Sequence, residues 1–285
     1  MIRIVSDSST LYSIEEARKN NLDIAPLAVT IDGKTYKELE DIQTEQFIDI
    51  IDQGHLPVSS QPAIGEVIEI FKKYPHDEII NIAMADGLSG TYNSACMAKG
   101  MVENGDAITV INSKTLCGPH RYLVDLALKM VELGKSKTEI ISVIEEMIEL
   151  TKSYLIPNDF EYLVRGGRLS PLVGRISIII KLVPVLTPSE DGTRLQKFTI
   201  KRTFKKAVDA ICLDLKEMGI DENYKIYISH ACNETQANYT KAIIEQNIAN
   251  ADIEMNMLTP AFTTQGGPRC ISVQIIKKHQ FMVQH

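Results

Sequence analysis

Short apolar runs alternate with amphipathic stretches along the first half of the chain. The apolar runs have the length of buried strands, and the stretches between them repeat apolar residues at helical spacing. The predicted strands cover residues 2–5, 22–29, 78–84 and 107–111, and the predicted helices begin near residues 13, 44, 62, 91, 123 and 136. Strands that alternate with helices in this way form a parallel, doubly wound sheet with helices on both faces.

The pattern changes after about residue 154. Two short apolar runs, residues 183–186 and 195–200, flank the turn sequence PSEDG at residues 188–192, which predicts a hairpin. Beyond the hairpin, predicted helices at 203–218 and 234–246 alternate with predicted strands at 224–229, 253–258 and 271–276. We therefore expect an α/β protein of two domains: residues 1–154 with the parallel sheet, and residues 155–285 with a mixed sheet.

Composition and charge narrow the possible functions. Hydrophobic residues make up 44% of the chain and the net charge is −7, without a dense basic run, so a nucleic-acid partner is not expected. The most apolar stretch, residues 176–186, is interrupted by Lys181 and Pro184 and is too short for stable insertion into a membrane. The five cysteines form no C-x-x-C pair, which favours reduced thiols in a cytoplasmic protein over a zinc site or disulfides.

Small hydroxyl residues recur in the loops that follow the predicted strands. In an open parallel sheet, ligands bind beyond the carboxyl ends of the strands, so we expect these loops to converge. Ser59 and Ser60 stand before one predicted helix, and Ser89 and Gly90 stand before another. The free N–H groups of a helix start, together with hydroxyls, attract phosphate or carboxylate. The alternative is that these serines only cap their helices.

Standard catalytic motifs are missing from the sequence. It has no P-loop, no nucleophile elbow, no dinucleotide-binding glycine motif and no H-E-x-x-H. Asp7, which follows the first predicted strand, and His230, at the end of a later one, are the best candidates for an acid and a base. An aspartate there is also typical of a turn cap, and His230 of a structural residue. No base accompanies the serines, which weakens a nucleophilic role for them.

Taken in order, several segments resemble the DegV family of bacterial fatty-acid-binding proteins. No single segment is decisive, but their order and spacing are specific, and they run from the first predicted strand to the last. The segments are VSDSS at 5–9, SSQP at 59–62, GLSGTY at 87–92, NSA at 93–95, LVRGGR at 163–168 and GGP at 266–268. The resemblance implies that a lipid lies between the two domains, with its carboxylate held by loops of the first.

The resemblance also implies a site. Ser59 and Ser89 hold the fatty-acid carboxylate, with Ser60 and Gly90 beside them. Many members of the family carry a histidine where this sequence has Gln265, and a glutamine can donate a hydrogen bond but cannot become cationic. The second domain is expected to cover the acyl chain. The candidate walls of the acyl slot are Met84, Ile176, Ile178, Ile180, Val183 and Phe262.

By the same resemblance, the protein is a carrier and not an enzyme. It binds a long-chain fatty acid without a metal or another cofactor and presents the carboxylate to a separate fatty-acid kinase, with Arg168 and Arg202 facing that kinase. Two alternatives remain. One is a hydrolase or transferase that acts on a small anionic substrate in the same cleft, with Asp7 and His230 as acid and base. The other is a sensor or scaffold whose ligand only sets its shape.

Overall fold

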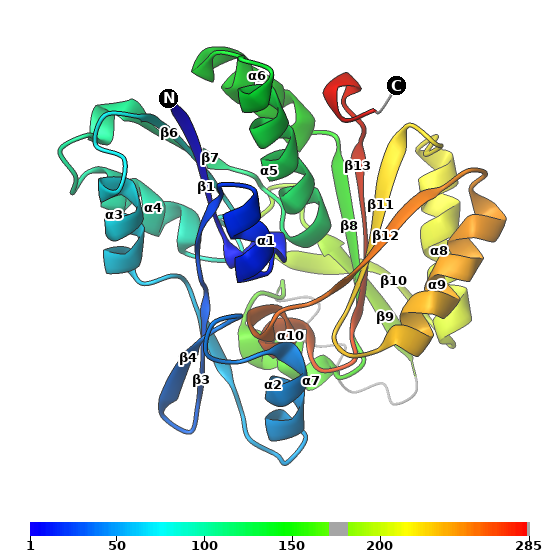
Figure 1. Ribbon diagram of the computed structural model, residues 1–285. Coiled ribbons are helices and arrows are strands. Elements are labelled where there is room, and N and C mark those ends of the chain that lie inside the picture. The colour runs from blue at the N-terminus through cyan, green and yellow to red at the C-terminus, as the bar shows by residue number, and fades with distance from the viewer. Residues whose placement is uncertain (171–181, 284–285) are drawn as a thin grey trace.

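A parallel sheet forms the centre of the first half of the chain. The computed structural model describes residues 1–170 and 182–283 (Figure 1). The order of the strands in this sheet is β2-β1-β6-β7. These strands are β1 (Ile2–Asp7), β2 (Asp23–Ala25), β6 (Glu78–Ala83) and β7 (Ile108–Asn112).

Helices cover both faces of this sheet, as the doubly wound prediction requires. On one face, α5 (Cys117–Glu132) and α6 (Lys137–Ile148) bury the apolar side chains that contact Ile4, Ile80 and Ile82. On the other face, α3 (Ile64–Lys72) and α4 (Thr91–Lys99) pack against Val5 and Ile79. The predicted fold class of the first half is therefore confirmed. The short α1 (Ile14–Lys19) begins at a capping box.

The second sheet is mixed and has the strand order β10-β9-β8-β13-β11-β12. Helices α8 (Phe204–Glu217) and α9 (Glu234–Asn247) cover one face, and α5 of the first half lies against the other (Figure 1). The predicted hairpin is present, because β9 and β10 pair antiparallel. The strands are β8 (Thr151–Ile156), β9 (Val183–Pro188), β10 (Leu195–Lys201), β11 (Tyr224–His230), β12 (Asp252–Met257) and β13 (Ile271–Lys277). Residue 154, where we expect the domain boundary, lies inside β8.

A third, antiparallel sheet with the order β4-β3-β5 was not predicted. The apolar run 22–29 is not one strand, because Pro26 lacks an N–H and separates β2 from β3 (Ala28–Ile31). β4 (Lys34–Lys37) follows β3 through Asp32 and Gly33, both at positive φ, which is the geometry of a two-residue hairpin turn. The third strand is β5 (Val58–Ser60).

Three further helices lie near these sheets. They are α2 (Thr44–Ile51), α7 (Phe160–Gly166) and α10 (Pro260–Gly266), and Figure 1 places them together below the two larger sheets. Short 3-10 turns follow β1, precede β7 and lie near the carboxyl end of the described chain. Within the described residues, none of the helices is both long and apolar enough to cross a bilayer.

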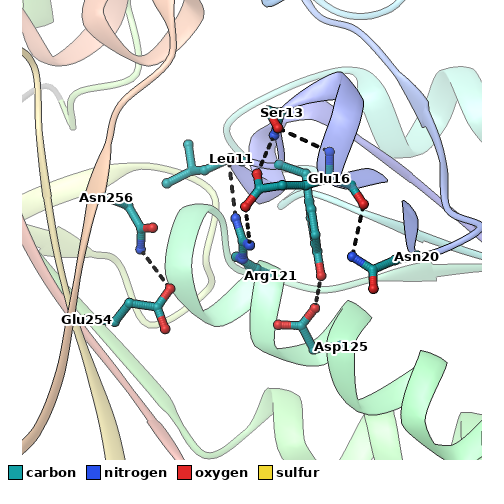
Figure 2. Close-up of polar contacts among 9 residues, drawn as sticks. Leu11, Ser13, Glu16, Asn20, Arg121, Asp125, Glu254 and Asn256 are labelled. Carbon is teal, nitrogen blue, oxygen red and sulfur yellow. Dashed lines mark hydrogen bonds and ion pairs between the residues drawn. The ribbon is translucent and has the colours of Figure 1, made fainter. Parts of the chain in front are cut away.

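A polar cluster joins α1 and α5 next to the second sheet (Figure 2). Arg121 stacks on the ring of Tyr12, 3.9 Å from its centroid, and donates a hydrogen bond to Glu16 at 3.3 Å. The Tyr12 hydroxyl donates to Asp125. In Figure 2, Glu254 of β12 lies on the opposite side of Arg121 from Asp125. Burial raises the pKa of Asp125 to about 6, although the Tyr12 hydrogen bond and the Arg121 charge act to lower it.

This shifted pKa predicts a pH-dependent term in the stability. Because the pKa of Asp125 is higher in the folded protein than the usual value of about 3.9, the folded state binds its proton more tightly. Protonated Asp125 contributes its full stabilisation below about pH 4. As the pH rises through about 6, this contribution to the free energy of unfolding, on the order of 3 kcal/mol, is lost. Asp125→Asn, which keeps an acceptor for Tyr12, should remove this term.

Denaturant unfolding of wild type and Asp125→Asn between about pH 4 and 7 measures the contribution of Asp125 to the free energy of unfolding. We expect the free energy of unfolding of wild type, relative to Asp125→Asn, to fall across this range. The matched control is Asp49→Asn, which makes the same chemical change at an exposed position of α2. Parallel profiles for wild type and Asp125→Asn would show that Asp125 ionises normally.

Candidate functional site

Two adjoining cavities lie where the three sheets and α10 approach one another. The smaller has a volume of about 340 Å³ and the larger about 520 Å³. Both volumes are in the range of small-molecule binding pockets. The residues that line both cavities are Met84, Leu88, Arg168, Phe262 and Gln265. The two cavities therefore adjoin at a common wall, and we treat them as one candidate site.

The polar residues predicted from the sequence come together in the smaller cavity. Ser59 and Ser60 reach it from β5, Ser89 and Gly90 from the loop before α4, and Gln265 from α10. The prediction placed all four loop residues at helix starts, and this is wrong for Ser59 and Ser60. They lie in a strand because β5 pairs with β3, and α3 begins only at Ile64.

The hydroxyl oxygens of the two serines each accept a hydrogen bond from the protein. The Gln265 side-chain N–H donates to Ser59 Oγ at 2.8 Å. The backbone N–H of Thr91 donates to Ser89 Oγ at 3.3 Å, and the two side-chain oxygens of this pair lie 2.8 Å apart. Each serine oxygen therefore already accepts a hydrogen bond from the protein. A hydroxyl that accepts in this way is polarised to donate to a further acceptor, such as an anion.

Gly90 brings the two serine loops into contact. A Cβ at this position would lie 1.9 Å from Gln61 Oε1, so a side chain here would push Gln61 away. Gly90 is also the N-cap of α4 and provides no side-chain cap to the first turn. The free N–H groups and the positive dipole end of this helix thus face the smaller cavity.

Among the described residues that line the smaller cavity, Arg168 is the one with a charged side chain. Its Nε donates to the backbone oxygen of Leu88 at 3.3 Å, which attaches the segment after α7 to the loop that carries Ser89. Arg202, in contrast, is exposed and lines neither cavity. The structure therefore separates the two arginines, one at the wall of the site and one at the surface.

A buried glutamate holds α10 against the site. Glu38 is completely buried, and its carboxylate accepts hydrogen bonds from Ala261 N at 2.8 Å and from the Ser8 hydroxyl. Burial raises the pKa of Glu38, against these hydrogen bonds, which lower it. The anchored helix begins one residue before Ala261 and carries both Phe262 and Gln265 into the cavities.

The predicted apolar walls have three different outcomes. Met84 and Phe262 line both cavities. Val183 lines neither, because alternation along β9 directs it with Val185 into the core under α8 and α9, while Leu186 faces the larger cavity. The three predicted isoleucines, Ile176, Ile178 and Ile180, lie outside the described residues.

Sequence reasoning missed much of the larger cavity. Leu155 lines it from β8, whose sequence TKSYLI at 151–156 shows no alternation of polar and apolar residues that would have identified the strand. Leu88 lies inside the GLSGTY motif, directly before Ser89, but it was not predicted as a wall of the site. Gln274 of β13 also lines the cavity, and a glutamine within an apolar strand was a further signal.

The candidate acid and base do not reach the cavities. Both carboxylate oxygens of Asp7 accept backbone hydrogen bonds at 3.0 Å, one from Ser9 and one from Met84, so its role is structural. His230 is 4% exposed and accepts from Asn233 N at 3.2 Å, and burial lowers its pKa. Neither residue lines either cavity.

The side chains of the site offer no ready nucleophile or metal centre in the described part of the chain. Cys117 and Cys270 line the larger cavity, but burial raises the pKa of both thiols, that of Cys270 to about 12. A protonated thiol is a poor nucleophile. Among residues 1–170 and 182–283, no three His, Cys, Asp or Glu side chains gather where they would hold a metal ion.

The fold and the cavities define an α/β protein with two adjoining cavities lined by residues of both large sheets, the small sheet and α10. The family model described as "Uncharacterised protein, DegV family COG1307" matches residues 1–278. The chain is 31% identical, over 278 residues, to a DegV domain-containing protein of Staphylococcus aureus, an alignment that covers 96% of this chain and 98% of the relative. The chain therefore belongs to the DegV family.

Two solved structures extend the comparison. DegV of Bacillus subtilis, described as a fatty acid binding protein, is 26% identical with a TM-score of 0.85 and covers 97% of this chain and 99% of its own. A fatty acid binding DegV family protein of Streptococcus agalactiae is 25% identical with a TM-score of 0.87 and covers 98% and 99%. Both structures agree with the α/β architecture described above.

Proposed function

We propose that this protein binds one long-chain fatty acid in the two joined cavities and is not itself an enzyme. The carboxylate lies in the smaller cavity, against Ser59, Ser60, Ser89, Gly90 and Gln265, and the acyl chain extends into the larger cavity. The observation that carries the proposal is the convergence of three serine hydroxyls on a cavity that adjoins a second, larger one. The binding activity described for the Bacillus and Streptococcus relatives supports it.

The energetics favour such a ligand. Burial of about 14 methylenes is worth on the order of 11 kcal/mol before the cost of ordering the chain. Loss of carboxylate hydration costs several kcal/mol, and charge-assisted hydrogen bonds of about 1.5–3 kcal/mol each offset this loss. Ser59, Ser89 and the open first turn of α4 can provide these bonds, so a metal is not needed.

Positive charge at the carboxylate comes from Arg168. Gln265 cannot become cationic, and the other residues that the structure describes at the wall of the smaller cavity are uncharged. The helix dipole of α4 and the guanidinium of Arg168 therefore replace the histidine found in many members of the family. Carboxylate binding by this protein therefore does not depend on the protonation of a histidine at this position.

A further part of the proposal is presentation of the carboxylate to a separate fatty-acid kinase. Arg168 reaches the site, while Arg202 is exposed at the start of α8, so the two arginines suit a surface that contacts the kinase and the transferred phosphate. In this scheme the carrier positions the substrate, and the kinase provides the catalytic groups. A carrier of this kind needs no acid or base of its own, in agreement with the structural roles of Asp7 and His230.

Native mass spectrometry of the purified protein tests the binding. We expect a bound species whose mass corresponds to one long-chain fatty acid, released on denaturation. An empty protein that also fails to take up added octadecanoic acid would contradict the proposal.

Incubation of the loaded protein with a bacterial fatty-acid kinase and ATP then tests presentation, with formation of the acyl phosphate as the readout. Arg202→Gln should reduce its rate and leave fatty-acid affinity unchanged.

A further inference from the structure

The turn between β9 and β10 forms part of the wall of the larger cavity. The turn covers residues 189–194, which we call the hairpin tip. Four of its residues line the cavity: Ser189, Glu190, Asp191 and Gly192. Glu190 and Asp191 are also exposed at the surface of the protein. The hairpin tip therefore lies between the larger cavity and solvent.

The hairpin tip is held together by hydrogen bonds of its own. The Gly192 N–H donates to the backbone oxygen of Ser189, and the Ser189 N–H donates to that of Arg194, both at 2.8 Å. Within the described residues, no hydrogen bond or ion pair joins the tip to residues 1–154. The tip can therefore keep its shape while it moves relative to the first half of the chain.

The hairpin tip contacts the first half of the chain at Gly87. A Cβ on Gly87 would lie 2.3 Å from the backbone oxygen of Gly192 and 2.4 Å from Thr193 Cα. Gly87 does not adopt a positive φ, so its backbone conformation alone does not require a glycine. The close approach of the tip is what excludes a side chain here. Because few atoms touch and no hydrogen bond forms, this contact can separate and form again at little cost.

The base of the hairpin is joined to Arg168. The Leu195 N–H donates to the backbone oxygen of Arg168 at 2.8 Å. The Arg168 side chain in turn donates to the backbone oxygen of Leu88 at 3.3 Å. The hairpin and Arg168 therefore contact neighbouring residues, Gly87 and Leu88, of the loop that carries Ser89. A carboxylate that binds at Ser89 and attracts Arg168 also favours contact between the tip and this loop.

We propose that the hairpin tip is a gate through which the acyl chain enters and leaves the larger cavity. In contact with Gly87 the gate is closed, and displaced from Gly87 it opens the cavity to solvent. The inference rests on the proposed function and adds how the fatty acid exchanges. A bound carboxylate holds the gate closed through Arg168, so exchange is limited by the population of the open state.

A shortened hairpin tests the gate. In this variant Asn-Gly replaces residues 190–193 between Ser189 and Arg194, whose backbones already pair as a two-residue hairpin turn requires. Stopped-flow fluorescence with a conjugated octadecatetraenoic acid measures its rates of association and dissociation. We expect both rates to rise roughly ten-fold or more, because minor states such as the open one are populated at about 0.1–10%. A wall that is merely damaged would speed dissociation alone.

Gly87→Ala provides a second test, because its methyl group would keep the complete hairpin tip away from the loop. We expect both rates to rise in this variant as well. Combined with the shortened hairpin, Gly87→Ala should add nothing, since the atoms that the methyl group would meet are then absent. The matched control is Gly65→Ala, whose Cβ would meet no atom within 4 Å and should leave both rates unchanged.

The outcomes separate this inference from the proposed function. Fatty-acid binding with association rates that are unchanged in the shortened hairpin and in Gly87→Ala overturns the inference and leaves the proposed function in place. An effect of Gly87→Ala that persists in full in the shortened hairpin also overturns it, because the methyl group then acts on the Ser89 loop alone. Failure of wild type to bind any long-chain fatty acid overturns the proposed function itself.

Discussion

Replacement of Ser89 by alanine is expected to weaken the binding of octadecanoic acid by roughly ten- to a hundred-fold. The removed hydroxyl would take away one charge-assisted hydrogen bond, worth about 1.5–3 kcal/mol, from a carboxylate that has left water. The protein should remain folded, because the hydrogen bonds of Ser89 in the structure are local ones to Thr91. Displacement of a fluorescent fatty acid measures the affinity, and thermal unfolding checks the fold.

Ser94 provides a matched control on the same helix. It lies on α4, is 1% exposed and has no hydrogen-bond partner among the described residues, but it does not line either cavity. Ser94→Ala should therefore leave the affinity unchanged. Equal affinities for wild type, Ser94→Ala and Ser89→Ala would place the carboxylate elsewhere. The double variant Ser59→Ala/Ser89→Ala should lose more affinity than either single variant.

The second large effect is expected at Gly118, where the two halves of the chain meet. A Cβ on this residue would lie 2.1–2.5 Å from atoms of Tyr227. Tyr227 is 2% exposed, and its strand β11 is held between β13 and β12, so the ring cannot move aside. We expect Gly118→Ala to lower the free energy of unfolding by about 3 kcal/mol or more, at the upper end of the cost of overpacking.

Gly65 is the corresponding control. It lies in α3, and a Cβ there would meet no atom within 4 Å, so Gly65→Ala should be neutral or stabilise the protein by up to about 1 kcal/mol. For a chain of this length, the loss at Gly118 corresponds to a decrease in Tm of roughly 6–12 °C. Calorimetry of both variants measures the difference. Similar Tm values for Gly118→Ala and Gly65→Ala would mean that Tyr227 and β11 can shift at little cost in free energy.

The cavity between the sheets gives the tyrosine contact a functional consequence. Gly118 follows Cys117, which lines the larger cavity, and α5 packs on both sheets. The close approach at Gly118 therefore also brings α5 near the second sheet beside the larger cavity. This explains why the glycine is needed inside a helix, where the residue is otherwise unfavourable by about 1 kcal/mol.

Local patterns in the sequence determined most of the secondary structure. Alternation of apolar runs and amphipathic stretches identified the parallel sheet, and PSEDG between two runs identified the β9–β10 hairpin. The same reasoning found Ser89 and Gly90, because a hydroxyl and a glycine before a helix form a local signal. The hairpin at Asp32 and Gly33 was equally available but was missed.

Only the tertiary structure decided how distant residues share the site. Gln265 donates to Ser59 across 206 positions, Arg168 reaches the loop of Ser89, and the Gln274 side chain donates to the backbone oxygen of Leu116. No period or spacing encodes such contacts, because they depend on how the sheets and α10 pack. The face on which Val183 lies was undetermined for the same reason. Sequence alone thus determined the elements and the donors, and packing decided which of them surround one cavity.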